Sequence, residues 1–276
     1  MAARFQIGWM RLVPFLGYHH VLMILLTIGM VFLSVMVAGC TTSNNLQNVY
    51  ILSLSYVPTA EMSSSPSPVQ LNGNISSTFS SIASTHSSLT VRVSYLGMCI
   101  SQIESQWMCS SNARTLSNLI KLYGGVRSGE QDPLNLIWIA GEFKDRVLFS
   151  GLLLTAIPLG FVATLILATF PGWHEELDDE GSEREVKPFP SRPVMKIALG
   201  ALTLGSLFCF ISVMLQHVAG AAGSAMVESL SYDTVRAKVG TASMVIGWGG
   251  ELLYVVATVG LLVLALSIRS LAGAED

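Results

Sequence analysis

The sequence predicts an all-α transmembrane four-helix bundle that carries a small, disulfide-linked, β-containing extracellular domain. Only 12% of the 276 residues are charged, about half the share expected of a soluble domain, and the mean hydropathy is +0.57. The charges also leave four long gaps, and a membrane span needs about 20 apolar residues to cross a hydrocarbon core of roughly 30 Å. A cysteine pair and alternating apolar residues in the first loop indicate the extracellular domain.

The four charge-free stretches fix the expected order of segments. We expect a cytoplasmic N-terminal tail at 1–20, a first span at 21–40, a large extracellular loop at 41–146, a second span at 147–170, an acidic cytoplasmic loop at 171–194, a third span at 195–216, a short extracellular loop at 217–238, a fourth span at 239–268 and a cytoplasmic C-terminal tail at 269–276.

The first apolar stretch has two alternative interpretations. It resembles the core of a cleaved signal peptide, and Val37-Ala38-Gly39-Cys40 resembles a bacterial lipoprotein cleavage box. However, the stretch is longer than the usual 7–15-residue signal core, and a tail of 20 residues precedes it. We therefore interpret it as a retained span.

The orientation follows from basic residues in short segments near the spans, which favour the cytoplasmic side. The N-terminal tail offers Arg4 and Arg11, whereas the short loop at 217–238 offers only Arg236 and Lys238. The acidic loop supplies Arg184, Lys187 and Arg192, Lys196 follows it directly, and Arg269 follows the fourth span. The glycosylation acceptor Asn74-Ile75-Ser76 agrees with an extracellular first loop.

The first loop is large enough to fold as a small domain. Apolar residues alternate over residues 50–56 and 89–95, which predicts two strands. The serine-rich insertion at 58–88 has too few large apolar residues to pack, and we expect it to be mobile. Helical spacing recurs over residues 116–123, and Asp132-Pro133 predicts the N-terminus of a further helix that runs into the second span.

The four cysteines divide into two pairs. Cys99 and Cys109 lie in the extracellular loop, and an even pair in an oxidising compartment predicts a disulfide. Cys40 and Cys209 lie at or inside the spans, where isolated cysteines behave as small hydrophobic side chains.

A motif surrounds the loop cysteines. Ser94-Tyr95-Leu96-Gly97-Met98-Cys99 is followed by Trp107 and then by Cys109. Gly97 predicts a close backbone approach or a positive φ beside the bridge, and Trp107 is expected to be an apolar anchor. This run resembles the signature of the claudin-like four-span superfamily, in which two glycines flank two bulky residues before the first cysteine. Ser94 replaces the first glycine, and Trp107 lies between the cysteines rather than before them.

The motif and the serine-rich loop are similar in particular to the fungal calcium regulator and membrane-fusion family of mating cells. The resemblance implies a plasma-membrane protein with both termini in the cytoplasm that conducts or regulates low-affinity calcium influx and supports fusion. It implies no cofactor, with calcium as the candidate transported ion. The expected partners are membrane lipid and either further copies of the chain or a calcium channel.

Glu251 is the single acidic residue inside a predicted span. A charge near the bilayer centre costs about 2.5–3.5 kcal/mol on insertion scales, so such residues are functional candidates. Two other interpretations are an outer position in the fourth span and a protonated carboxyl that packs between helices. Further candidates for an ion path are the extracellular acidic residues Glu142, Asp145, Glu228 and Asp233.

Several classes of function are not expected. The net charge of −3 and the lack of a basic patch argue against a nucleic-acid partner. The sequence carries no HExxH, GxSxG or intramembrane CxxC motif, so we do not expect an enzyme, and it assigns no metal ligands. The alternative function is a claudin-like structural or adhesion organiser of the plasma membrane that conducts no ions itself.

Overall fold

The computed structural model describes residues 17–43, 45–57, 72–84, 89–101, 107–124, 132–170, 174–177, 183–186 and 190–272. The chain divides into two compact units. The helical unit comprises Met1–Phe32, Leu153–Phe210 and Gly249–Asp276, and the sheet unit comprises Leu33–Leu152 and Ile211–Trp248.

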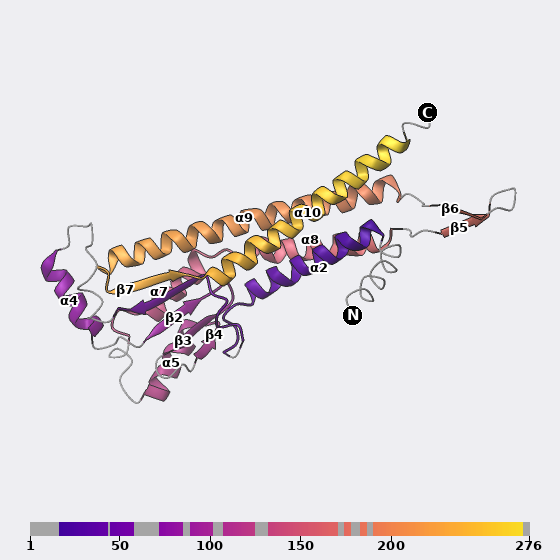
Figure 1. Cartoon of the computed structure of the whole chain (residues 1–276). Coiled ribbons are helices and arrows are strands. Elements are labelled where there is room, and N and C mark those ends of the chain that lie inside the picture. The colour runs from indigo at the N-terminus through magenta and orange to yellow at the C-terminus, as the bar shows by residue number, and fades with distance from the viewer. Residues whose placement is uncertain are drawn as a thin grey trace, which may run out of the picture. The chain divides into compact units, whose positions relative to one another are not determined.

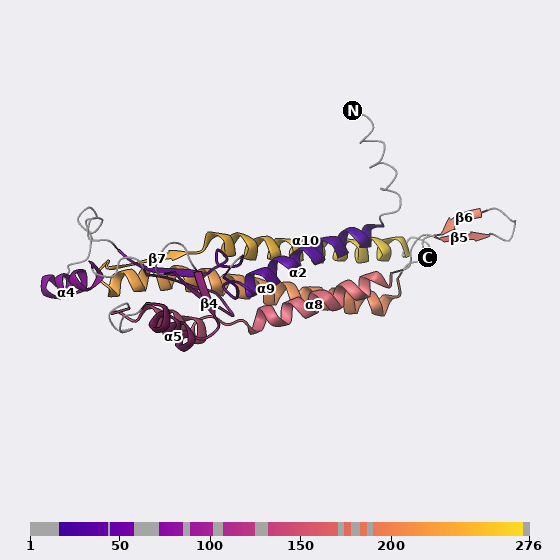
Figure 2. The same cartoon turned by 90° about the horizontal axis from the view of Figure 1, so that it is seen from below.

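Four helices are long and apolar enough to cross a membrane, as the sequence predicts. They are α2 (Tyr18–Val37), α8 (Gly151–Ala168), α9 (Arg192–Leu230) and α10 (Thr241–Ala272). Figures 1 and 2 show that within the helical unit the four run alongside one another. Between the second and third of them, the acidic segment contains a two-stranded hairpin, β5 (His174–Leu177) and β6 (Glu183–Val186).

The third membrane helix is longer than the predicted span. Residues 217–230, expected to be part of a short loop, continue α9 to Leu230. This segment contains four alanines and no proline, and alanine has the highest helix propensity. At 1.5 Å per residue its 39 residues extend to about 58 Å, roughly twice the hydrocarbon thickness. The drop in hydropathy after residue 216 therefore does not coincide with the end of the helix.

The sheet unit contains a five-stranded antiparallel sheet in the order β4-β3-β2-β1-β7. The two strands expected from alternation are confirmed as β1 (Leu52–Tyr56) and β2 (Thr90–Val93). β3 (Met98–Ser101) and β4 (Trp107–Ser110) add a hairpin to the same sheet. The fifth strand, β7 (Val235–Val239), comes from the second loop and pairs with β1 along its whole length.

Two helices cover one face of this sheet. α5 (Ala113–Gly124) confirms the helical spacing after the cysteines, and α7 (Leu136–Arg146) follows it. Because strand side chains alternate between faces, every second residue of β1 and β2 enters the core. The core residues are Leu52, Leu54, Tyr56, Leu89, Val91, Val93, Met98, Ile100, Leu116, Ile120, Leu136, Ile137, Ala140, Val235 and Ala237.

The start of α7 differs in detail from the prediction. The helix begins at Leu136 rather than directly after Asp132. The Asp132 carboxylate nevertheless caps it, because Oδ1 accepts from the Leu136 N–H at 2.7 Å and Oδ2 from the Ile137 N–H at 3.0 Å. Tyr56 also donates its hydroxyl to Asp132 at 2.9 Å, and burial raises the pKa of that phenol. The helix ends at Arg146 and does not run into α8.

The serine-rich insertion is more ordered than expected. Residues 73–84 form the helix α4 (Gly73–Ser84), while residues 58–71 and 85–88 lie outside the described part of the chain. The Asn72 side chain caps α4 by accepting from the Asn74 N–H at 3.2 Å. The ring of Phe79 lies 5.7 Å from the ring of Tyr232. This helix therefore packs against the rest of the sheet unit, contrary to the prediction that the insertion would not pack. The serine hydroxyls of α4 donate to carbonyls of its preceding turn, which satisfies them within the helix.

The predicted disulfide is confirmed. Cys99 and Cys109 lie directly opposite each other on β3 and β4 and are bonded. A Cβ on Gly97 would lie 2.1 Å from the carbonyl oxygen of Cys40, so only glycine allows this approach. Cys40 itself has a φ of 54°. The motif glycine thus makes room for the turn that follows α2.

Gly97→Ala should destabilise the sheet unit by about 1–3 kcal/mol, because the new methyl group overlaps the Cys40 carbonyl. In a Cys209→Ser background Cys40 is the remaining free thiol, and its labelling by a maleimide during heating reports unfolding. Gly73→Ala is the matched control, since a Cβ there meets nothing within 4 Å. Equal labelling temperatures for the two variants would contradict this assignment.

Candidate functional site

Residues of the cysteine motif make several structural contacts within the sheet unit. The Tyr95 hydroxyl donates to the Gln216 side chain on α9 at 3.2 Å, whereas Leu96 is exposed. The backbone of the turn at Cys40 packs directly against Gly97. Burial raises the pKa of the Cys40 thiol to about 12. Cys40 therefore stays a protonated, unreactive thiol at neutral pH.

Trp107 does not act as the expected apolar anchor. It lies half-buried outside the core cluster, on the face of the sheet opposite the helices. Its ring lies 4.0 Å from the guanidinium carbon of Arg92, and the ring of Tyr50 lies 4.7 Å from the same carbon. Arg92 also donates to the Asn48 side chain at 2.8 Å. The rings of Trp107 and Tyr50 thus both form cation–π contacts with Arg92. Because Arg92 is on β2 and Trp107 is on β4, this contact depends on the pairing of both strands with β3.

Glu251 lies in the interior of the helical unit. It is 4% exposed and sits about 15 Å along α10 from its first residue, at 1.5 Å per residue. Its Oε1 accepts from the Ser206 hydroxyl at 3.3 Å, and Cys209 lies beside it. Its Oε2 is buried and has no hydrogen-bond partner among the described residues. A buried carboxylate oxygen without a partner is uncommon and costly.

Tyr254, one turn after Glu251, fills the centre of the helical unit. It is fully buried, and its hydroxyl donates to the Ala156 carbonyl at 3.3 Å. Its ring or hydroxyl occupies space that a Cβ would need on Gly29 and Gly160, and its ring lies 3.4 Å from the Cβ position of Gly205, in van der Waals contact. These glycines come from three different helices, so the tyrosine is packed on three sides. Sequence reasoning missed this residue, because a tyrosine in an apolar helix carries no signal of what surrounds it.

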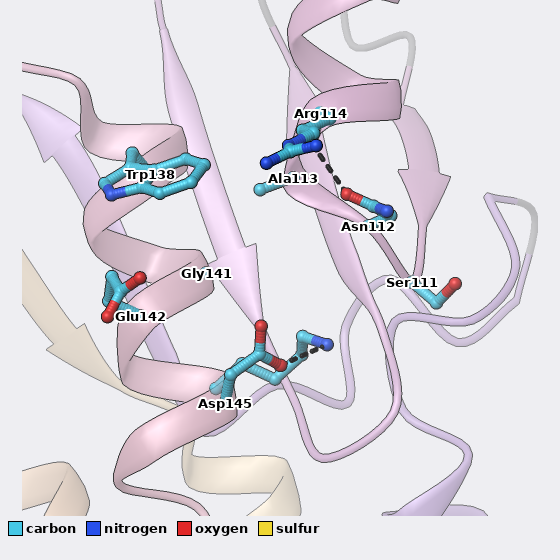
Figure 3. Close-up of a pocket in the computed structure, with 9 residues that line it drawn as sticks. Ser111, Asn112, Ala113, Arg114, Trp138, Gly141, Glu142 and Asp145 are labelled. Carbon is cyan, nitrogen blue, oxygen red and sulfur yellow. Dashed lines mark hydrogen bonds and ion pairs between the residues drawn. The ribbon is translucent and has the colours of Figure 1, made fainter.

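Each of the four acidic candidates outside the predicted spans has a neighbouring group or a turn position that explains its presence. Glu142 pairs with Arg146 on the same helix, and Asp145 pairs with Lys144 at 2.8 Å. Glu228 accepts from the Ala237 N–H at 3.1 Å, which joins the end of α9 to β7. Asp233 occupies the turn between them with a φ of 57°. Glu142 and Asp145 line one hollow (Figure 3).

Two further features bear on ion binding and modification. Within the residues that the structure describes, no three His, Cys, Asp or Glu side chains gather as metal ligands would. Asn74 is exposed in the first turn of α4, so its amide is accessible to modification.

Comparison with known families identifies a family to which these features belong. The sequence profile of the Fig1 family, described as "Ca2+ regulator and membrane fusion protein", matches residues 75–267. The match begins within α4 and ends within α10, and it includes the cysteine motif, Glu251 and Tyr254. No curated protein gives a significant match to the chain. With well over half of its length matched, this multi-pass membrane chain belongs to the Fig1 family of calcium regulators and membrane-fusion proteins.

Proposed function

We propose that the chain is a four-span plasma-membrane protein that regulates low-affinity calcium influx and supports membrane fusion during fungal mating. Family membership supports calcium regulation and fusion. The basic residues near the spans support cytoplasmic termini, and the disulfide supports an oxidising environment for the sheet unit.

The observation that carries the proposal is the buried Glu251 with one oxygen unpartnered. An acidic group inside a membrane bundle is retained at a free-energy cost, so function is its default explanation. Glu251 is also the one acidic residue between Thr241 and Arg269, and no acidic residue occurs between Lys196 and Glu228. A cation path uses rings of acidic side chains, and a single chain supplies one carboxylate here.

The packing around that carboxylate favours regulation over conduction by this chain. Tyr254 occupies the interior one turn away. Of the extracellular acidic candidates, Glu142 and Asp145 are paired with basic residues and Glu228 accepts from a backbone N–H. The chain then affects influx by assembling with a calcium channel. Glu251 is buried and accepts from Ser206 on a neighbouring helix, so it acts on that assembly through the arrangement of the helices and not by direct contact with the channel.

A second candidate, a membrane organiser, is favoured by the outer face of the sheet. On β1, Ser53 lies between Arg92 of β2 and Lys238 of β7. Ser55, two residues further along β1, pairs with Arg236 of β7. These three basic residues share the face opposite the core, and none of the five strands of this sheet contains an acidic residue. Such a face suits contact with an anionic surface.

The extracellular position of the first loop is tested at Asn74. Expressed in a fungal secretory system, the wild-type chain should carry a glycan, and Asn74→Gln should migrate faster on a gel. Asn118→Gln, which alters an exposed asparagine outside any acceptor motif, should leave mobility unchanged. If glycosidase treatment does not shift the wild-type chain, and loop thiols introduced by mutation react only from the cytosol, the orientation is reversed.

Glu251→Gln should lower calcium uptake per surface molecule several-fold, because it keeps the side-chain shape and removes the charge. Uptake is measured in mating cells and divided by the number of molecules labelled at the surface, which separates function from expression. The matched control is Glu142→Gln, an equal change outside the bundle that should leave uptake unchanged. An unaltered ratio for Glu251→Gln would refute the role of this carboxylate and favour the organiser.

A further inference from the structure

A groove with polar walls lies between α5 and α7 on the sheet unit. It consists of two adjoining hollows of about 540 and 380 Å³, which share Ala113, Arg114 and Trp138. Volumes of about 300–1,000 Å³ are typical of small-molecule sites. A Cβ on Gly141 would lie 3.0 Å from the Ala113 Cβ. These two small residues therefore let the helices approach closely at the floor and leave the groove open above it.

Trp138 is the central side chain of the groove. It is 51% exposed and projects from α7 across the gap toward Ala113 and Arg114 at the start of α5 (Figure 3). Its large apolar ring remains accessible to water although its neighbours Ile137 and Ala140 are buried in the core. An exposed indole offers an apolar face and an N–H donor at the same place.

Neutral hydrogen-bonding groups surround this ring. The larger hollow is lined by Ser117, Asn118 and Asn135, whose hydroxyl and amides both donate and accept. Asn135 is held with a φ of 54°, a conformation that costs free energy in residues other than glycine. The turn is fixed by the bond from its N–H to the Asp132 carbonyl at 3.1 Å. Since Asp132 rather than Asn135 caps α7, the Asn135 amide is not used for capping.

The formal charges along the groove balance. Arg114, Lys121 and Lys144 are basic, and Asp132, Glu142 and Asp145 are acidic. An anionic peptide or a free cation would meet charges of its own sign in this lining. A neutral ligand with many hydroxyl groups would not be repelled by either kind of charge. Each of its hydroxyls can also pair with either a donor or an acceptor of the lining.

We propose that this groove binds a neutral hexose oligosaccharide, with one sugar ring stacked on Trp138. The C–H face of a hexose is apolar and fits the indole, while its hydroxyls face outward toward Asn118, Asn135 and Arg114. The two hollows, which both include Trp138 and Arg114 in their linings, accommodate successive sugar units. This inference does not depend on the proposed role in calcium influx.

The test uses the full chain in lipid nanodiscs, because maltoside detergents carry a hexose headgroup that would compete. Neutral glucose-, mannose- and N-acetylglucosamine-based oligosaccharides are titrated while intrinsic tryptophan fluorescence and calorimetry are recorded. We expect saturable binding of at least one class, weakened tenfold or more in Trp138→Ala and largely retained in Trp138→Phe. Asn118→Ala should weaken binding several-fold.

The control variant is Leu122→Ala, which removes an exposed apolar side chain from α5 outside the groove and should bind as the wild type does. Every variant is first checked for the Cys99–Cys109 disulfide by mass spectrometry of non-reduced peptides, so that only folded protein is compared. The proposal is overturned by no binding at millimolar concentration, by equal binding of wild type and Trp138→Ala, or by binding of acidic peptides in place of neutral oligosaccharides.

Discussion

The sheet unit depends on the contact between Gly97 and the carbonyl of Cys40. This contact places the turn after α2 directly against the disulfide hairpin, where the Cys99 sulfur lies 3.5 Å from the same carbonyl oxygen. A second close approach supports it, since a Cβ on Gly39 would lie 2.3 Å from the Val49 carbonyl oxygen. Two glycines on two different segments thus allow backbone to pack on backbone. The cysteine motif is therefore a structural device that fixes where the sheet begins.

The two units differ in their chemistry. The helical unit is apolar, and its interior is filled by Tyr254 beside a single buried carboxylate. The sheet unit carries most of the described charges. Glu142 and Asp145 pair with basic neighbours, and Asp132 and Glu228 accept from backbone N–H groups. The strongest concentration of negative charge is in the acidic segment, where β5 and β6 carry Glu175, Glu176, Glu183 and Glu185. Within the four predicted spans Glu251 is the single acidic residue, whereas a cation pathway uses rings of acidic side chains. This distribution supports regulation of a separate calcium channel.

Much of this architecture could be predicted from the sequence, where the signal is local. Charge-free stretches indicated four spans, alternation indicated β1 and β2, and the loop cysteines indicated their bond. The missing parts depend on distant partners. β7 is five residues long, and its pairing partner β1 lies nearly 180 residues earlier in the sequence. Hydropathy marks where a helix leaves an apolar environment, not where it ends, so the extension of α9 was missed.

The candidate site also combines features that local sequence predicts with features that depend on distant partners. Glu251 could be singled out because a lone acid in an apolar helix is a local pattern. Its partner Ser206 and the filling of the interior by Tyr254 depend on which helix faces lie together. Trp107 was expected to be an apolar anchor because tryptophan is apolar, but strand register places it on the outer face of the sheet beside Arg92. Local alternation in a four-residue strand does not specify which face is buried.

Calcium flux through the purified chain tests the central claim most directly. The protein is reconstituted alone into liposomes that contain a calcium indicator, and a calcium gradient is applied across the membrane. If the chain regulates a separate channel, influx should equal that of protein-free liposomes at every protein density. Influx that rises with protein density and is abolished by Glu251→Gln would contradict the account and identify the chain itself as the conduit.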